Sequence, residues 1–356
     1  MTTSPYSSLP KRQFWRTGVR DADWTTIDDL YRKKFPIEKT TKIMTAGSCF
    51  AQHIGRNMKK NGYLVIDEER APSIALPDAA KEYGYGIYSA RYGNIYTARQ
   101  LLQLIREAFG RRSPKDIVWE KDGRFYDALR PAVEPNGHAS PAEVLAHRED
   151  HLARVRAVVH QADLLIFTFG LTEAWIHKES GTVYPTAPGT IAGNFDPAVH
   201  AFINFTYDDV LSDFERVRRV VQRRRPDIRF LVTVSPVPLT ATAANDHVLC
   251  STMHSKSILR AVAGTLTARY PDIDYFPSYE VIGSPFVGSF YDDTKRSVTD
   301  EGVSTVMSIF FREHGTADAQ ETKEARANGQ APKQSTMTPP SRDDVVCEEV
   351  LLDAFA

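Results

Sequence analysis

Four short apolar runs, each ended by turn residues or by a helical segment, constrain the fold of this chain more than any other feature. They span residues 42–46, 163–169, 228–235 and 273–276, and a weaker run spans 63–66. Helical patterns lie between or after them at 98–109, 141–161, 207–225, 255–269 and 302–312. Strands that alternate with helices predict a parallel sheet covered on both faces. We therefore predict an α/β fold of three-layer αβα, flavodoxin-like type, with its ligand site beyond the carboxyl ends of the strands.

The composition changes along the chain and predicts three regions. Residues 1–40 contain Trp15, Trp24, Tyr31 and Phe35, which indicates an aromatic N-terminal arm packed on the body. Residues 41–313 carry the strand and helix patterns and form the α/β domain. Residues 314–356 are polar over most of their length and predict a disordered tail. The tail ends in a short amphipathic patch that either docks on the body, binds a protein partner or frays.

The charge balance and the cysteines exclude several classes of protein. Lysine plus arginine (44) nearly equals aspartate plus glutamate (45), so no basic field indicates nucleic acid. The N-terminus lacks the apolar core of a signal peptide, and no stretch is long and apolar enough to predict a membrane span. Three distant cysteines match neither a disulfide framework nor a zinc site. We expect a cytoplasmic protein with reduced thiols, no metal and no cofactor.

Ser48 is the residue that most strongly indicates chemistry. It follows a predicted strand and Gly47, and it precedes a helical pattern. This arrangement places its hydroxyl at the carboxyl end of the sheet, beside the first free N–H groups of the helix. Those groups stabilise an oxyanion that forms when a serine hydroxyl attacks a carbonyl carbon. The simpler alternative is that Ser48 only caps the helix.

Five sequence blocks carry a resemblance to a known family. They are Gly47-Ser48-Cys49-Phe50-Ala51, Arg91-Tyr92-Gly93-Asn94-Ile95-Tyr96, Phe169-Gly170-Leu171-Thr172-Glu173-Ala174-Trp175, Ser235-Pro236-Val237-Pro238 and Tyr275-Phe276-Pro277-Ser278-Tyr279-Glu280. In this order they resemble the GSCFA family, which looks like a branch of the SGNH/GDSL hydrolase superfamily. The resemblance implies a serine-dependent esterase or O-acyltransferase with Ser48 as nucleophile. By analogy alone it also implies a small-molecule or carbohydrate ester as substrate, such as an O-acetyl group on a polysaccharide.

The resemblance also implies an oxyanion hole. Its donors would be the N–H of Ser48, the N–H of Gly93, and the hydroxyl of Thr172, which stands where the superfamily has asparagine. Gly93 is equally suited to a turn before a helix, and Asn94 beside it is a secondary candidate. Glu173 replaces the usual aspartate and is either a site residue or a carboxylate at a helix start.

The expected catalytic base is missing from its usual place. The superfamily's Asp-x-x-His falls on Asp293 and Arg296, and a guanidinium stays protonated and accepts no proton. His247, in a loop after run 228–235, is our first alternative, with Asp293 or Asp246 orienting its ring. His254 and His177 rank behind it, although a surface position competes for each of the three. The histidines interpreted as surface residues are His138, His147, His151, His160 and His200.

Two further interpretations remain open. A protein that has lost its base but kept the fold would act as a non-catalytic or accessory carbohydrate-binding protein, and Arg296 favours that alternative. A metal-dependent enzyme is disfavoured because no His, Asp and Glu cluster has ligand spacing. The Gly- and Pro-rich segment 181–195 is either an ordinary loop or a wall of the substrate site.

Overall fold

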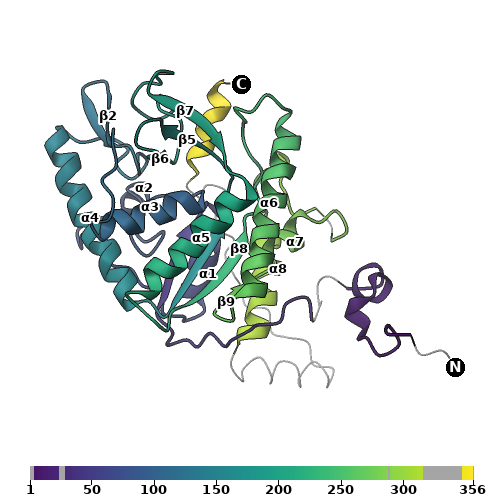
Figure 1. The fold of residues 1–356 in the computed structure, drawn as a ribbon. Coiled ribbons are helices and arrows are strands. Elements are labelled where there is room, and N and C mark those ends of the chain that lie inside the picture. Colours follow the sequence, from purple (N-terminus) through teal and green to yellow (C-terminus); the bar gives the residue numbers. More distant parts are fainter. Residues whose placement is uncertain (1–3, 24–28, 288, 316–346, 356) are drawn as a thin grey trace. The chain divides into compact units, whose positions relative to one another are not determined.

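The predicted strands form one parallel sheet in the computed structural model (Figure 1). Its order is β1-β4-β8-β9, and all three pairings are parallel. A single parallel bridge between Val65 and Ile43 adds the weak run 63–66 on the other side of β1. The resulting order 2-1-3-4-5 is that of flavodoxin-like sheets, so the predicted fold class is confirmed. The strands are β1 (Ile43–Gly47), β4 (Leu164–Phe169), β8 (Arg229–Val234) and β9 (Ile273–Tyr275).

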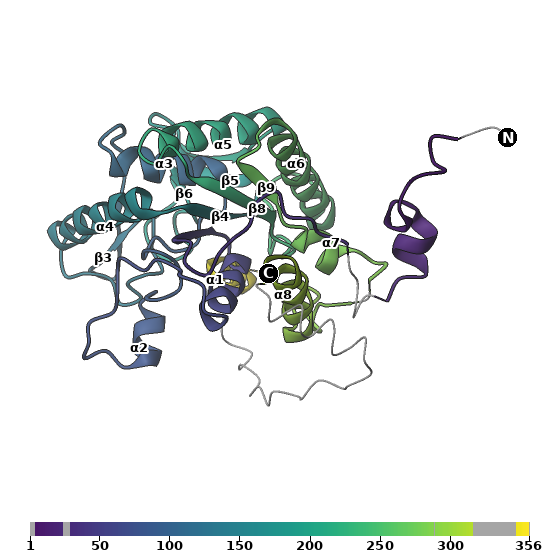
Figure 2. The same ribbon diagram turned by 90° about the horizontal axis from the view of Figure 1, so that it is seen from below.

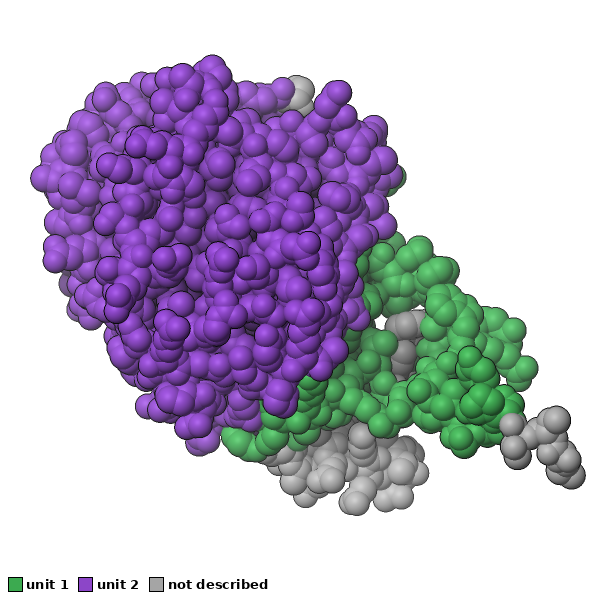
Figure 3. Space-filling model, viewed as in Figure 1, with its two compact units in different colours: residues 1–38, 276–341 green, residues 39–275, 342–356 purple. Residues whose placement is uncertain are grey.

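The structure describes residues 4–23, 29–287, 289–315 and 347–355. The chain divides into two compact units, coloured separately in Figure 3. One unit comprises residues 1–38 and 276–341, and the other comprises residues 39–275 and 342–356. The sheet lies entirely in the second unit. Trp24 and most of the predicted disordered tail, residues 316–346, lie outside the described residues.

Helices cover both faces of the sheet (Figure 2). Helix α1 lies on one face, and α5 and α6 lie on the other. Strands β4 and β8 are almost wholly buried, which explains why their sequences are continuous apolar runs rather than alternating ones. The helices of this unit are α1 (Phe50–Lys60), α2 (Pro77–Glu82), α3 (Ala98–Ala108), α4 (Pro141–Gln161), α5 (Tyr207–Gln222), α6 (Val248–Arg269) and the 3-10 helix η3 (Glu348–Phe355).

A second sheet, which the sequence patterns did not predict, follows β4 directly. Its order is β6-β5-β7, with antiparallel pairing throughout. Segment 181–195 contributes β6 to it, so this segment is partly ordered by strand pairing rather than being only a loop. The strands are β5 (Glu173–His177), β6 (Val183–Tyr184) and β7 (His200–Asn204), and a separate hairpin pairs β2 (Val118–Lys121) with β3 (Arg124–Asp127).

The first unit joins the N-terminal arm to the last long helix. Tyr31 is buried, its hydroxyl lies 2.9 Å from His314 Nε2, and its ring packs edge-on against Phe276. Its elements are the short helices η1 (Lys11–Gln13) and η2 (Arg16–Arg20), α7 (Ser278–Gly283) and α8 (Asp300–His314). None of the helices in the described ranges combines the length and the apolar character that a bilayer-spanning segment needs.

Candidate active site

Ser48 lies at the carboxyl end of β1, as its position in the sequence predicts. Its N–H donates to the carbonyl of Thr168 in the neighbouring strand β4 at 3.2 Å. The side chain is buried, yet its hydroxyl has no hydrogen-bond partner among the described residues. A buried hydroxyl without a partner costs free energy, and such groups occur mainly where a ligand or water completes the bonding.

The structure contradicts the helix-capping alternative for Ser48. The N-cap position of α1 is Cys49, which makes no side-chain cap. Ser48 takes part in the first turn only through its backbone carbonyl, which accepts from Ala51 N–H at 2.9 Å. The sequence suggested a cap because a serine just before a helix usually is one. Here the hydroxyl is left available instead.

Gly170 brings the end of β4 against Ser48. A Cβ built on Gly170 would lie 2.8 Å from Ser48 Cβ and 3.1 Å from the carbonyl oxygen of Tyr96, so only glycine fits. The N–H groups of Gly170 and Leu171 both donate to that same Tyr96 carbonyl at 3.0 Å. The first three sequence blocks therefore meet at one corner of the sheet.

Asn94 occupies the centre of this corner. Its side-chain carbonyl accepts from Tyr88 at 2.5 Å and from Gln52 at 3.1 Å. The Tyr88 hydroxyl also lies 3.1 Å from the carbonyl oxygen of Ser48. Two donors on one side of the amide turn the Asn94 NH₂ group the other way, where it serves as a donor to a third residue. Sequence analysis held Asn94 only as a secondary candidate.

Glu348 is the residue that receives the Asn94 amide. Its carboxylate is buried and accepts from Asn94 Nδ2 and, at 2.7 Å, from the hydroxyl of Tyr96. A Cβ built on Gly93 would lie 3.5 Å from the second carboxylate oxygen, and Gly93 itself has a φ of +67°. A segment more than 250 residues away in the sequence thus enters the corner.

Thr172 lies at the same edge of the sheet as Ser48, because both follow adjacent parallel strands. Its N–H donates to Ser255 Oγ at 3.0 Å, whereas its buried hydroxyl has no partner among the described residues. Ser48 and Thr172 therefore share a property that a packed hydroxyl normally lacks.

His247 is the N-cap of α6. Its Nδ1 accepts the N–H of Leu249 at 3.1 Å, and its own N–H donates to Asp246 at 2.8 Å. The residue is exposed, and Nε2 is the nitrogen left for other chemistry. Asp293 lies in the turn between α7 and α8 of the first unit, whereas Ser48 and His247 belong to the second.

The structure corrects two expectations about the other secondary candidates. Helix α6 begins at Val248, not at residue 255, so His254 lies inside the helix and is exposed. Glu173 begins strand β5, not a helix, and both carboxylate oxygens accept from Thr242 at 2.8 and 3.0 Å. His177 ends the same strand, opposite His200 of β7.

A cavity of about 220 Å³ adjoins the strand that starts at Glu173. Its walls include Trp175, Thr186 from segment 181–195, and Leu352 from η3. Burial raises the pKa of Glu173, and the Thr242 hydroxyl, the Ala243 N–H and nearby His254 oppose that shift. The cavity is mostly apolar with one ionisable group, which is typical of small-molecule sites.

Lys256 is a site residue that sequence analysis missed. It is almost completely buried in α6, and its ammonium group donates to the carbonyl of Gly170 at 2.7 Å. A buried lysine is rare and requires partners. No sequence signal could have found it, because α6 lacks a clear apolar face and a lysine in a helix is ordinarily a surface residue.

Three histidines predicted at the surface are buried. His151 Nδ1 lies 2.7 Å from Glu69, and burial and the positive charge of Arg130 lower the pKa of His151 to about 4. His200 is buried in β7 and lies 3.1 Å from Asp116. His138 is also buried, and burial lowers its pKa. The polar context of these histidines in the sequence gave no sign of their long-range partners.

One group of side chains meets the distance requirement for a metal site. Ligand atoms of Glu134, His138 and His147 lie within 4.8 Å of one another. Spacing in the sequence did not reveal this group, because the fold and not a ligand motif brings the three side chains together. Glu134 already pairs with the Arg91 guanidinium at 2.7 Å, which reduces what its carboxylate can offer a cation.

Together, the sheet order and the corner around Ser48 define a flavodoxin-like α/β protein with a candidate serine site at the carboxyl edge of its sheet. The chain belongs to the GSCFA family, whose family model matches residues 42–310. No curated protein matches the sequence.

Solved structures give only loose likenesses. A carbohydrate esterase family 3 protein from Talaromyces cellulolyticus is 9% identical with a TM-score of 0.30, over 82% of this chain and 100% of that chain. A carbohydrate acetylesterase family member from Sinorhizobium meliloti is 14% identical with a TM-score of 0.26, over 63% of this chain and 94% of that one. Scores of this size do not establish a shared activity.

Proposed function

We propose that this protein is a serine-dependent esterase or O-acyltransferase in which Ser48 is the nucleophile. The observation that carries the proposal is the buried Ser48 hydroxyl, which neither caps α1 nor bonds to any described residue. It lies at the carboxyl end of a parallel strand and at the start of a helix, where backbone N–H groups stabilise negative charge. The N–H of Gly93 and the hydroxyl of Thr172 serve as further oxyanion donors.

The general base is a separate question, because a serine hydroxyl needs a group that accepts its proton. His247 remains our first candidate: with Nδ1 engaged as the N-cap, Nε2 is the nitrogen that would accept the proton. In this proposal Asp246 orients the ring. Lys256 joins His254, His177 and Glu173 as an alternative, because its amine contacts the Gly170 carbonyl beside Ser48.

The substrate in this proposal is a small acyl ester, such as an O-acetyl group on a carbohydrate. The cavity beside Glu173 is large enough for an acyl group and part of its acceptor. Whether the acyl group passes to water or to a second hydroxyl depends on what enters the site after the first step.

A fluorophosphonate probe tests the nucleophile directly. The probe should modify Ser48, as located by mass spectrometry of the digested protein, and Ser48→Ala should lose the adduct. Ser235→Ala is a matched control, because Ser235 is also buried beyond a strand end but its hydroxyl accepts the N–H of Val237 at 3.3 Å. An adduct elsewhere, or none, contradicts the proposal and favours an accessory carbohydrate-binding role, in line with Arg296 in the base position.

A further inference from the structure

Glu348 is a buried carboxylate without a cation. It is 4% exposed, and no lysine or arginine forms an ion pair with it in the described part of the chain. Its hydrogen-bond donors are the neutral groups of Asn94 and Tyr96. A buried charge that lacks an opposite charge retains much of its desolvation cost. No ion pair among the described residues adds to these two hydrogen bonds, so a ligand that binds the same donors competes with Glu348.

The donors around Glu348 are themselves held by other residues. Tyr88 and Gln52 both donate to the Asn94 carbonyl, which fixes the Asn94 NH₂ group toward the carboxylate. Gly93 adopts a left-handed φ and offers no side chain against the second carboxylate oxygen. Both donors converge on one oxygen of the carboxylate, and the open backbone position at Gly93 leaves room for the other oxygen.

The rest of the C-terminal segment reaches the neighbouring cavity. Leu352 lies in the same helix η3 as Glu348 and lines the cavity beside Glu173. Figure 1 shows this helix, in yellow, beside β5 and β7. One short segment thus places the Glu348 carboxylate against the hydrogen-bond donors of Asn94 and Tyr96. The same segment lines the apolar cavity with Leu352.

We propose that Gly93, Asn94 and Tyr96 form a binding site for carboxylates, and that Glu348 is its resident ligand until an external carboxylate or a substrate displaces it. The ligand class follows from the group that occupies the donors, the Glu348 carboxylate, and from the space beside its second oxygen. The regulatory consequence rests on the proposed function: ester hydrolysis releases a carboxylate, and a substrate that needs this corner must first expel Glu348.

Acetate alone tests the binding site. We expect Glu348→Ala to bind acetate about tenfold or more tightly than the wild-type protein in isothermal titration, because the internal competitor is gone. Asp353→Ala removes a carboxylate from an exposed position of the same helix and should leave acetate affinity unchanged. Adding Asn94→Ala to Glu348→Ala should abolish the gain. Circular dichroism checks the fold, and Glu348→Gln, which keeps the side-chain volume, replaces the alanine variant if that one unfolds.

Equal acetate affinity in the wild-type protein and both Glu348 variants would overturn the proposal, as would an equal gain in Asp353→Ala. The regulatory part is measured with p-nitrophenyl acetate, for which Glu348→Ala should lower KM. Ser48→Ala separates the two proposals: it should lose turnover while it keeps the wild-type affinity for acetate. Activity that survives Ser48→Ala contradicts the proposed function but leaves the acetate result standing.

Discussion

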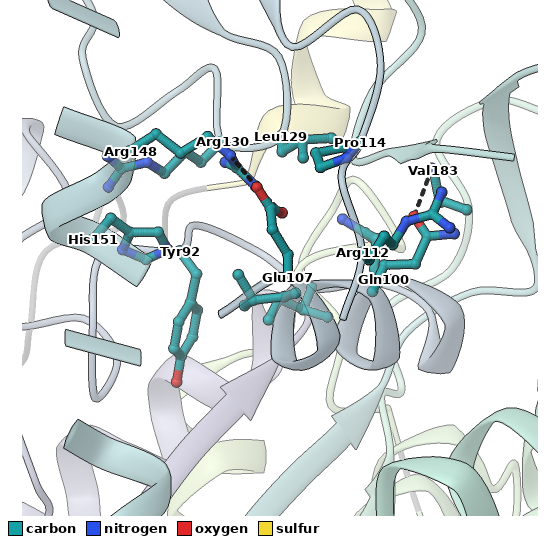
Figure 4. Close-up of a pocket in the computed structure, with 13 residues that line it drawn as sticks. Tyr92, Gln100, Glu107, Arg112, Pro114, Leu129, Arg130, Arg148, His151 and Val183 are labelled. Atoms are coloured by element: carbon teal, nitrogen blue, oxygen red, sulfur yellow. Dashed lines mark hydrogen bonds and ion pairs between the residues drawn. The ribbon is translucent and has the colours of Figure 1, made fainter. Parts of the chain in front are cut away.

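The small cavity lined by α3 and α4 and the corner around Ser48 are both buried and polar, but their hydrogen bonding differs. The cavity encloses only about 30 Å³, and Figure 4 shows the charged side chains that line it. There, Arg148 and Arg130 both bind Asp127, and Arg130 also bonds to Glu69, which His151 contacts at 2.7 Å. Each of these side chains therefore has at least one hydrogen-bond partner.

The Ser48 corner contains hydroxyls that have none. The hydroxyls of Ser48 and Thr172 are buried without a hydrogen bond among the described residues, and within the same ranges no ion pair holds the Glu348 carboxylate. A satisfied buried network stabilises the fold, whereas unsatisfied groups await a ligand. Strong pKa shifts therefore do not by themselves locate a functional site, because the pKa values of about 2 at Asp127 and about 4 at His151 belong to the charged cluster.

The nucleophile should give the largest effect. Ser48→Ala should lower kcat roughly 10⁴-fold or more and leave the free energy of unfolding unchanged. His247→Ala should do the same if His247 is the base, and the double variant should be no worse than either single one, because the pair acts as a unit. Steady-state kinetics and urea unfolding measure both quantities. If Ser48→Ala lowers kcat and His247→Ala does not, the general base is instead Lys256, His254, His177 or Glu173.

Substitutions in the charged cluster around Asp127 should lower stability and leave turnover unchanged. Asp127→Asn leaves Arg130 and Arg148 incompletely paired and should destabilise the fold by about 3 kcal/mol, with turnover per folded molecule unchanged. Asp150→Asn is the control, because its pair with Arg154 is exposed and should contribute less than about 1 kcal/mol. Urea unfolding measures the free energy of unfolding of both variants. Equal losses in the two variants would show that burial does not distinguish these ion pairs.

Thr172→Val tests the second unpartnered hydroxyl. It keeps the shape of the side chain and removes the donor, so turnover should fall roughly a hundredfold while folding survives. Thr45→Val is a matched control, since the Thr45 hydroxyl is also buried without a partner but lies inside β1. A fully active Thr172→Val protein would leave backbone N–H groups as the oxyanion donors and reduce Thr172 to packing.

Acid should weaken the charged cluster in two steps. The pKa of His151 is lowered from 6.5 to about 4 by burial and by Arg130, so the unfolded chain binds more protons and stability falls as pH drops through that window. Burial raises the pKa of Asp127, but Arg148 and Arg130 outweigh it and hold the value at about 2, so a second loss of about 2 kcal/mol occurs from pH 3.8 to 2.

Urea unfolding at a series of pH values measures both steps. His151→Gln keeps a donor for Glu69 and removes the titration, so the first step should vanish and the second should remain. A first step of unchanged size in His151→Gln would show that another group titrates there.

The sheet was predictable because burial on both faces requires continuous apolar runs, which β4 and β8 show in the sequence. The place of Ser48 followed from the same runs, since a residue after a parallel strand must lie at the carboxyl edge. The second sheet escaped prediction because β5 and β7 are only partly buried and lack continuous apolar runs, and their pairing joins segments that local patterns do not connect. The start of α6 was missed because its first turn is exposed on most sides and lacks a periodic apolar signal.

The sequence by itself determined the strands of the main sheet and their order along the chain, the family, and the serine that we propose as nucleophile. Local periodicity and the motif blocks encode these features directly. The tertiary structure alone decided that Ser48 is not a helix cap, that His151 is buried, and that Glu348 enters the corner held by Asn94 and Tyr96. Each of these depends on a hydrogen-bond partner, or on the lack of one, and partners distant in sequence become neighbours only when the chain has folded.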